Sequence, residues 1–253
     1  MSISLQGVTK RFDGRAAVDG VEALAPTGAF FAVLGPSGCG KSTLLRLIAG
    51  LERLDAGAIA LDGETVAGPG RHVPPEVRRA GVVFQSYALW PHMTVAENVA
   101  FPAETAGLPR AEVRAAVDRA LAAVSMTALA ARRPAELSGG QRQRVALARC
   151  LAQSAGTILM DEPLANLDPH LRAAMEGELA AFHRAAGATT LYITHDQREA
   201  MALADVVAVM RDGRFEQVAP PETVYARPAT EHVARFIGRA ALIAAELAPE
   251  GPG

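Results

Sequence analysis

A glycine-rich segment near the start of the chain has the composition and spacing of a phosphate-binding loop. Its residues are Gly35, Pro36, Ser37, Gly38, Cys39, Gly40, Lys41, Ser42 and Thr43. Glycines let backbone N–H groups converge on one centre, and the N-terminus of a following helix adds a partial positive charge. In this P-loop pattern Lys41 would reach the β- and γ-phosphates of a nucleotide, and Ser42 would ligate Mg²⁺. The segment therefore predicts a site for ATP and Mg²⁺.

Two carboxylates follow an apolar run at residues 157–160. Asp161 and Glu162 stand where a buried strand of an open α/β sheet would end, and such sheets bind ligands at that edge. Asp161 would hold Mg²⁺ through water, and Glu162 could accept a proton from the attacking water as a general base. The alternative is an ordinary strand end with solvated acids, which a P-loop in the same chain disfavours.

A second segment with phosphate-binding chemistry precedes a helical pattern at residues 141–151. It consists of Leu137, Ser138, Gly139, Gly140 and Gln141. The Ser138 hydroxyl and the first N–H groups of the helix would form an anion site, although Ser138 could also cap its own helix. Gly139 and Gly140 are an unfavourable start for a helix unless a ligand must approach closely. Two such segments in one chain indicate a nucleotide that is shared with a partner.

The elements that position these residues follow from the hydrophobic pattern. Apolar runs at residues 29–34, 81–84, 157–160 and 189–193 indicate buried strands. Residues 41–49 carry apolar side chains at helical spacing, so a strand feeds the glycine loop and the loop opens a helix.

The rest of the chain separates into a strand-rich start and a helical insertion. Residues 2–25 are rich in strand signals, after which strands and helices are expected to alternate. Strand signals stop between about residues 87 and 151, where residues 111–124 carry a helical apolar stripe. Strands resume at Thr157, Thr189 and Val206, a hairpin turn falls at Asp212 and Gly213, and helices are expected at residues 220–226 and 230–237.

This order predicts an α/β fold: a P-loop NTPase (RecA-like) core with an N-terminal antiparallel β subdomain and an inserted helical subdomain at about residues 87–151. We expect one domain over residues 1–238 and a short disordered tail at 239–253, which is rich in alanine, glycine and proline. With 253 residues, of which 50% are hydrophobic, the chain can bury a sizeable core.

Composition excludes several classes of protein. The formal net charge of -2 argues against a generally basic surface for nucleic acid. The arginines of residues 141–149 are expected mainly to form salt bridges on a helix surface. Cys39 and Cys150 form no metal-binding pattern and are expected to be reduced thiols of a cytosolic protein. No apolar stretch reaches the roughly 18 residues that a membrane span needs.

Taken together, these motifs resemble the ATP-binding subunits of ABC transporters, over about residues 3–238. The residues that carry the resemblance are the segment from Gly35 to Thr43, Gln85, the segment from Leu137 to Gln141, Asp161, Glu162, Asn166, Leu167, Asp168 and His195. Residues 83–95 and 192–197 are most similar to importer subunits that serve binding-protein-dependent uptake.

The resemblance implies roles for residues that are unremarkable by themselves. Gln85 would contact Mg²⁺ and the attacking water, and His195 would touch the γ-phosphate and help to position Glu162. Phe12 would stack on adenine; the alternative is a core residue of the first hairpin. Asp168 would lie in a loop that crosses the interface of a head-to-tail dimer. In that dimer Ser138, Gly139, Gly140 and Gln141 of one subunit would cover the γ-phosphate held by the other.

The resemblance also implies partners and a location. A homodimer, or a pair of ATPase subunits, would sit at the cytoplasmic face of the cell membrane. It would contact transmembrane permease subunits between Tyr87 and Met93, and through them a periplasmic or extracellular solute-binding protein. Interior packing is the alternative for that segment. Ferric iron, phosphonate, polyamine, sulfate and sugar remain open as transported substances, with iron or phosphonate favoured by the residues around Trp90.

Two further points complete the resemblance. Many importer subunits of this type continue into a C-terminal regulatory domain, which we do not expect here as a full domain. A soluble ABC-type ATPase acting on nucleic acid or ribosomes is the alternative function, although the chain lacks the coiled-coil, zinc-binding or duplicated segments usual in that class, and no nucleic-acid partner is expected. A nucleotide-binding regulator without turnover is disfavoured by Lys41, Gln85, Glu162 and His195.

Overall fold

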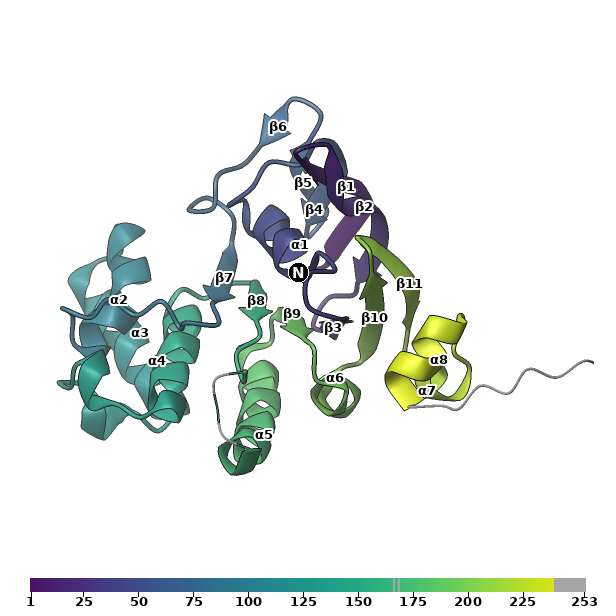
Figure 1. The fold of residues 1–253 in the computed structure, drawn as a ribbon. Coiled ribbons are helices and arrows are strands. Elements are labelled where there is room, and N and C mark those ends of the chain that lie inside the picture. The colour runs from purple at the N-terminus through teal and green to yellow at the C-terminus, as the bar shows by residue number, and fades with distance from the viewer. Residues whose placement is uncertain (166, 168, 239–253) are drawn as a thin grey trace, which may run out of the picture.

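A mixed sheet forms the centre of the molecule. The computed structural model describes residues 1–165, 167 and 169–238 (Figure 1). In spatial order the strands of this sheet are β11 (Arg214–Ala219), β10 (Val206–Arg211), β3 (Phe30–Leu34), β9 (Thr189–Thr194), β8 (Thr157–Asp161) and β7 (Ala80–Val83). All neighbours pair in parallel except β11, which forms a hairpin with β10. Because parallel strands end at one edge, the loops after β3, β7, β8 and β9 converge there.

An antiparallel sheet from the first part of the chain lies beside the central sheet. Its strands in order are β2 (Arg15–Ala25), β1 (Ile3–Phe12), β4 (Ala56–Leu61), β5 (Glu64–Gly68) and β6 (Arg71–His72). The expected alternation of strands and helices after residue 25 is wrong here, because β4 returns to pair with β1. Asp62 and Gly63 both have positive φ, as the tight turn between β4 and β5 requires.

Eight α-helices are found in the described residues. They are α1 (Lys41–Ala49), α2 (Val95–Thr105), α3 (Arg110–Ala123), α4 (Gly139–Ala152), α5 (Pro169–Ala186), α6 (Gln197–Leu203), α7 (Pro221–Ala226) and α8 (Glu231–Gly238). Short 3-10 turns occur at Thr127–Leu129 and Pro134–Glu136. None of the helices in the described part of the chain combines the length and apolar character needed to cross a bilayer.

Helices α2, α3 and α4 form a group that shares a hydrophobic core, and Figure 1 shows this group beyond β7, at the edge of the central sheet. The predicted α/β architecture, with an N-terminal antiparallel β subdomain and an inserted helical subdomain, is confirmed. The limits of that subdomain at residues 87 and 151 stay a prediction. The tail at 239–253 lies outside the described residues, so its expected disorder also stays a prediction.

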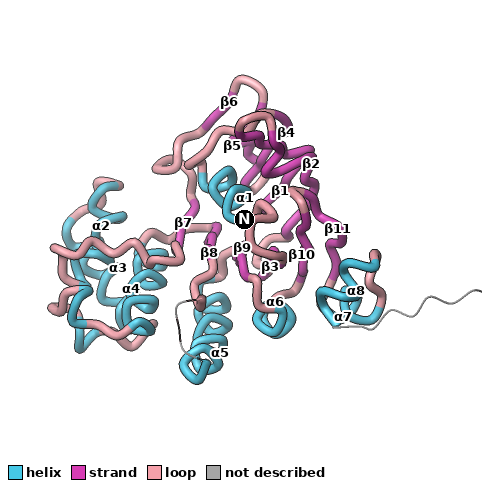
Figure 2. Tube along the Cα trace, viewed as in Figure 1, coloured by secondary structure: helices cyan, strands magenta, loops and turns pink. Residues whose placement is uncertain are grey.

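Helix α1 packs between the two sheets (Figure 2), and a buried arginine holds its C-terminus. Arg78 donates hydrogen bonds to the carbonyls of Leu47 and Ile48, both at 2.7 Å, in the last turn of the helix, where carbonyls lack the usual i+4 donor. It also donates to Val73 O at 2.8 Å. Burial lowers the pKa of Arg78 to about 10. The helix that begins at the glycine loop is therefore fixed from its other end.

Candidate active site

The glycine loop connects β3 to α1, as the sequence predicts. A side chain at Gly35 would overlap the carbonyl oxygen of Met210, and one at Gly40 would overlap that of Ala17. Gly40 also has a φ of 112°, which L-residues with side chains rarely adopt. The glycines are thus needed because neighbouring backbone passes close to the loop.

Lys41 is 4% exposed and turns its ammonium group back into the loop. Nζ donates to Gly35 O at 2.8 Å and to Pro36 O at 3.0 Å. It lies 3.9 Å from Oε1 of Glu162, which follows β8. The positive charge is therefore centred between the loop backbone and a carboxylate at the edge of the sheet.

Ser42 and Asp161 present oxygen atoms side by side. Ser42 Oγ donates to Asp161 Oδ1 at 2.9 Å. Burial raises the pKa of Asp161, an effect that the hydrogen bond from Ser42 opposes. A hydroxyl and a carboxylate suit Mg²⁺, which proteins commonly hold through one or two such groups together with water and substrate phosphates. The residues present therefore fit the predicted metal.

Glu162 lies between the ammonium group of Lys41 and the imidazole ring of His195. Its Oε2 lies 3.0 Å from His195 Nδ1, while Oε1 faces Lys41. Its N–H donates to Ile193 O at 3.0 Å, and its φ of 47° is unusual for a residue with a side chain. Such backbone strain costs about 1–3 kcal/mol and is concentrated at functional sites. The carboxylate is thus oriented by the fold.

A buried hydrogen-bond network holds the segment that carries His195. Thr194 Oγ1 accepts from Asp196 N at 2.9 Å and donates to Glu199 Oε2 at 2.6 Å. Tyr192 also donates to that oxygen, at 2.8 Å. Burial raises the pKa of Glu199, and Arg172 of α5 lies 3.8 Å from its other oxygen. Sequence reasoning missed this network, since no local pattern brings α5 and α6 together.

The remaining predicted residues lie around this centre. Gln85 is exposed in the loop after β7, the strand that pairs with β8. Phe12 ends β1 and is 44% exposed, so the alternative of a hairpin core residue is wrong. Lys10 Nζ lies 5.1 Å from the centroid of its ring. Asn166 and Asp168 lie outside the described residues.

The second glycine segment begins α4, which Figure 1 places in the helical group and apart from α1. Ser138 caps the helix: its Oγ accepts from Gln141 N at 3.3 Å, and Gln141 Oε1 accepts from Ser138 N at 2.9 Å. The capping role that the sequence left open is therefore present. Gly139 and Gly140 occupy the first turn, where backbone N–H groups have no intrahelical acceptor.

The segment between Tyr87 and Met93 is divided between interior and surface. Tyr87 is 6% exposed and packs in the core with Ile158 and Met160, so the interior alternative holds for this residue. Pro91 and His92 are exposed. Ala88 and Trp90 help to line a groove of about 500 Å³, whose other lining residues include Phe84, Phe101, Leu108 and Arg149.

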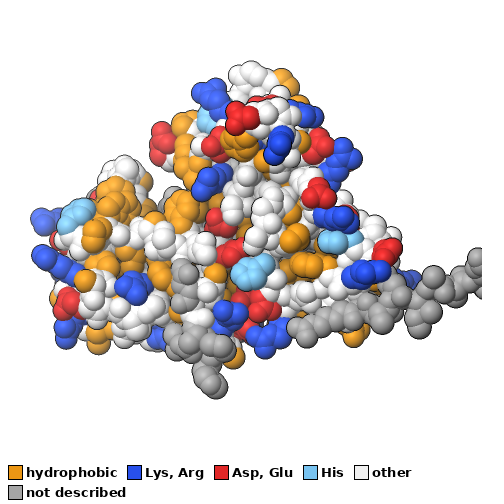
Figure 3. All heavy atoms as spheres, viewed as in Figure 1, with side chains coloured by type: hydrophobic (Ala, Val, Ile, Leu, Met, Phe, Trp, Pro, Cys, Tyr) orange, Lys and Arg blue, Asp and Glu red, His pale blue; other side chains and the backbone are white. Residues whose placement is uncertain are grey.

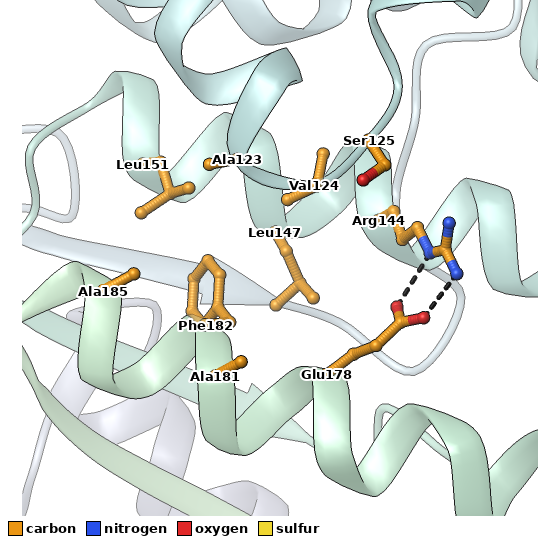
Figure 4. Close-up of a pocket in the computed structure, with 10 residues that line it drawn as sticks. All are labelled: Ala123, Val124, Ser125, Arg144, Leu147, Leu151, Glu178, Ala181, Phe182 and Ala185. Atoms are coloured by element: carbon orange, nitrogen blue, oxygen red, sulfur yellow. Dashed lines mark hydrogen bonds and ion pairs between the residues drawn. The ribbon is translucent and has the colours of Figure 1, made fainter.

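The arginines of α4 differ in environment. Arg144 forms a two-point ion pair with Glu178 of α5, at one end of an apolar pocket of about 400 Å³ (Figure 4). This agrees with the expected salt bridges. Arg149 was expected mainly on the surface, but it is 8% exposed and donates to the carbonyls of Tyr87 and Ala88. The correction arises because residues 87–88 pack across that side of α4.

The two cysteines yield a prediction about reactivity. Cys39 is buried in the glycine loop, and burial raises the pKa of its thiol, so less thiolate is present at neutral pH. We expect maleimide to modify Cys39 more slowly in the folded chain than in denaturant, and the modified fraction to lose ATP affinity through bulk. Mass spectrometry and nucleotide binding measure both. In a Cys39→Ser variant the remaining thiol is Cys150, whose pKa burial raises to about 11. Labelling of that variant therefore measures the contribution of Cys150 and serves as the control. Rapid labelling with ATP affinity retained would contradict the expectation.

The sequence of this chain is similar to those of known proteins. The family described as ABC transporter matches residues 18–165. The spermidine/putrescine import ATP-binding protein PotA of Pseudomonas aeruginosa is 49% identical over 245 residues, 97% of this chain and 66% of that protein. The sn-glycerol-3-phosphate import ATP-binding protein UgpC 1 of Rhizobium johnstonii is 48% identical over 240 residues, 95% of this chain and 64% of that protein. The chain thus spans about two thirds of the length of these relatives.

A solved structure supports the same comparison. It is the dimeric post-hydrolysis state of the ATP-binding cassette MJ0796 bound to ADP and Pi. The match has a TM-score of 0.73 and 29% sequence identity, and it covers 87% of this chain and 98% of that chain.

Proposed function

The chain belongs to the ABC transporter family, and on that premise we propose that it binds ATP with Mg²⁺ and hydrolyses it to drive solute import through a membrane permease. One observation carries the proposal. The carboxylate of Glu162 lies between the buried ammonium of Lys41 and the ring of His195, at the sheet edge where the glycine loop opens α1. A carboxylate in this position beside the glycine loop supports the role of general base for Glu162.

The residues divide the chemistry among them. Lys41 exchanges its bonds to loop carbonyls for the β- and γ-phosphates, and the loop N–H groups hold the remaining oxygens. Ser42 and Gln85 would hold Mg²⁺, with Asp161 acting through water, and the ion would supply charge stabilisation for the phosphoryl transfer. Glu162 accepts the proton of the attacking water. His195 orients that carboxylate and contacts the γ-phosphate, while Phe12 stacks on adenine.

A second copy of the chain completes each site in this proposal. The structure of MJ0796 is dimeric, which supports pairing in a relative of this fold. Ser138 Oγ uses an acceptor lone pair to cap α4, so its O–H remains able to donate to a phosphate. The N–H groups of Gly139 and Gly140 can act beside it, and Gln141 fixes the turn. The residues of one copy thus cover the nucleotide held by the other.

Mixing two inactive variants tests this shared site. Lys41→Ala removes the phosphate contact of one chain, and Ser138→Arg blocks the covering surface of the other. Each variant alone should be nearly inactive. In an equal mixture, half of the dimers would have one complete site, so we expect ATPase activity to recover to about a quarter of that of the unmodified protein. Activity that stays at background although mixed dimers form would contradict the head-to-tail arrangement.

The partners and the location belong to the same proposal. Two relatives are named as import ATP-binding proteins, which supports a permease partner and a position at the cytoplasmic face of the membrane. The groove that Ala88 and Trp90 help to line is the proposed permease-facing surface. On the face that Figure 3 shows, hydrophobic side chains gather over α2–α4, and basic and acidic side chains are interspersed. Copurification of a permease, rather than of ribosomes or nucleic acid, is the direct test.

The transported solute is set by other chains in this scheme. The two relatives carry the names of importers for different solutes, spermidine/putrescine and sn-glycerol-3-phosphate, at nearly the same identity. Neither name is ferric iron or phosphonate, the classes that the residues around Trp90 favoured. Identification of the copurified permease and binding protein would name the solute.

A further inference from the structure

The backbone is strained where the chain leaves β7 and approaches α2. Tyr87 has a φ of 63° and Ala88 a φ of 46°, so two consecutive residues with side chains occupy the left-handed region. Residues with a side chain avoid this region because their Cβ crowds the backbone. Such a turn persists only where surrounding groups hold it.

Arg149 of α4 supplies one of those groups. Its guanidinium donates to Ala88 O at 2.7 Å and to Tyr87 O at 3.1 Å, which fixes both carbonyls of the strained turn. The same group lies 5.2 Å from the centroid of the Trp90 ring, within the range of a cation–π contact. These contacts require the planar guanidinium of arginine, because one group donates to two carbonyls and also lies against an aromatic ring.

Asn98 of α2 holds the next part of the segment. Its side chain is 0% exposed, and its Oδ1 accepts from Trp90 N at 2.8 Å. The two N–H bonds of its Nδ2 are shared among three acceptors, Thr94 O at 2.9 Å, Trp90 O at 3.2 Å and Met93 O at 3.3 Å. Both the oxygen and the nitrogen of the buried amide therefore form hydrogen bonds to the backbone of one loop.

The segment held in this way forms a wall of the groove. Ala88, Trp90 and Arg149 all line it, and the Trp90 and Phe101 rings lie 4.2 Å apart between centroids. We propose that Asn98 and Arg149 are positioning residues that clamp residues 87–94 into a preformed docking surface. The inference rests on the proposed permease partner. Preorganisation raises affinity because the loop need not be ordered when the partner binds.

Trp90 is the only tryptophan of the chain, so its fluorescence reports on the clamp without any partner. In Asn98→Ala we expect a red-shifted emission and faster acrylamide quenching, with far-UV circular dichroism and ATP affinity retained. Glu104→Gln is the matched control, because Glu104 lies on the same helix, is exposed and is not among the residues that line the groove. Unchanged Trp90 emission and quenching in Asn98→Ala would overturn the clamp.

A second variant covers the case in which Asn98→Ala does not fold. Arg149→Lys keeps the charge but loses the planar fork, so Trp90 should again become more accessible to quencher. Adding Ala88→Gly should then move quenching back toward that of the unmodified chain, because glycine adopts the left-handed turn without strain. A loss of order in Arg149→Lys that Ala88→Gly does not reduce would contradict a role in holding the strained turn.

The permease that copurifies with the unmodified chain, returned to detergent solution, tests the docking step. We expect Asn98→Ala to bind it about tenfold more weakly, since ordering the loop then opposes association. Equal affinity of the variant and the unmodified chain, with a loosened Trp90, would overturn preorganisation. If the unmodified chain binds no permease, the proposed function fails, while the fluorescence result still decides whether the clamp exists.

Discussion

Replacing Glu162 with glutamine is expected to slow ATP hydrolysis by about 10²–10⁴-fold while ATP binding is retained. Glutamine keeps the shape of the side chain but cannot accept the proton of the attacking water. It also keeps an oxygen that can face Lys41, which lies 3.9 Å from the carboxylate. A radioactive or coupled assay of phosphate release from ATP measures the rate of hydrolysis, and nucleotide titration measures the affinity for ATP. Glu112→Gln, an exposed change of the same chemistry on α3, is the control.

The same variant tests the dimer. Without hydrolysis the γ-phosphate contacts persist, so the closed pair of chains should accumulate when ATP and Mg²⁺ are present. Light scattering during size-exclusion chromatography gives the mass in solution. A strictly monomeric Glu162→Gln chain with bound ATP, both free and with its permease, would remove the basis of the shared site. Near-normal turnover would instead remove Glu162 from its role as the base.

Replacing Arg78 with methionine is expected to lower the free energy of unfolding by about 3 kcal/mol. Two effects compete. Burial lowers the pKa of Arg78 to about 10, so its charge costs stability below that pH, and removing it relieves this cost. The loss of its hydrogen bonds removes a donor from several buried carbonyls, including that of Ile48, and a buried carbonyl left unpaired costs about 1–3 kcal/mol. Since several carbonyls are exposed to this loss together, the second effect wins.

Urea denaturation compares Arg78→Met with Arg79→Met. Arg79 is the exposed neighbour, and changes at exposed positions usually stay within about 0.5 kcal/mol. Because α1 begins at the glycine loop, we also expect weaker ATP binding in Arg78→Met near its unfolding midpoint. Equal midpoints for the two variants would show that Arg78 does not secure the helix.

Local patterns in the sequence predict the segments to which we assign phosphate binding. The P-loop pattern predicts a helix over residues 41–49, and α1 spans Lys41–Ala49. Strands begin at Thr157, Thr189 and Val206, as the apolar runs indicate, because buried parallel strands are nearly continuous in apolar residues. These signals depend on neighbours within a few positions, so they can be read without knowledge of the fold. Roles given to Phe12, Gln85 and Ser138 by resemblance stay predictions.

The contacts between distant segments depend on strand order and side-chain burial, which no local pattern encodes. Glu162 and His195 are 33 positions apart and meet because β8 and β9 are neighbours in the sheet. Strand β4 likewise pairs with β1, although the glycine loop and α1 lie between the two strands in the sequence. Arg149 has the spacing of a surface residue, yet it is buried by a turn about 60 positions earlier in the chain. Long-range packing selects among arrangements that local propensity leaves equal, because burial against a partner segment outweighs the preference of a single residue.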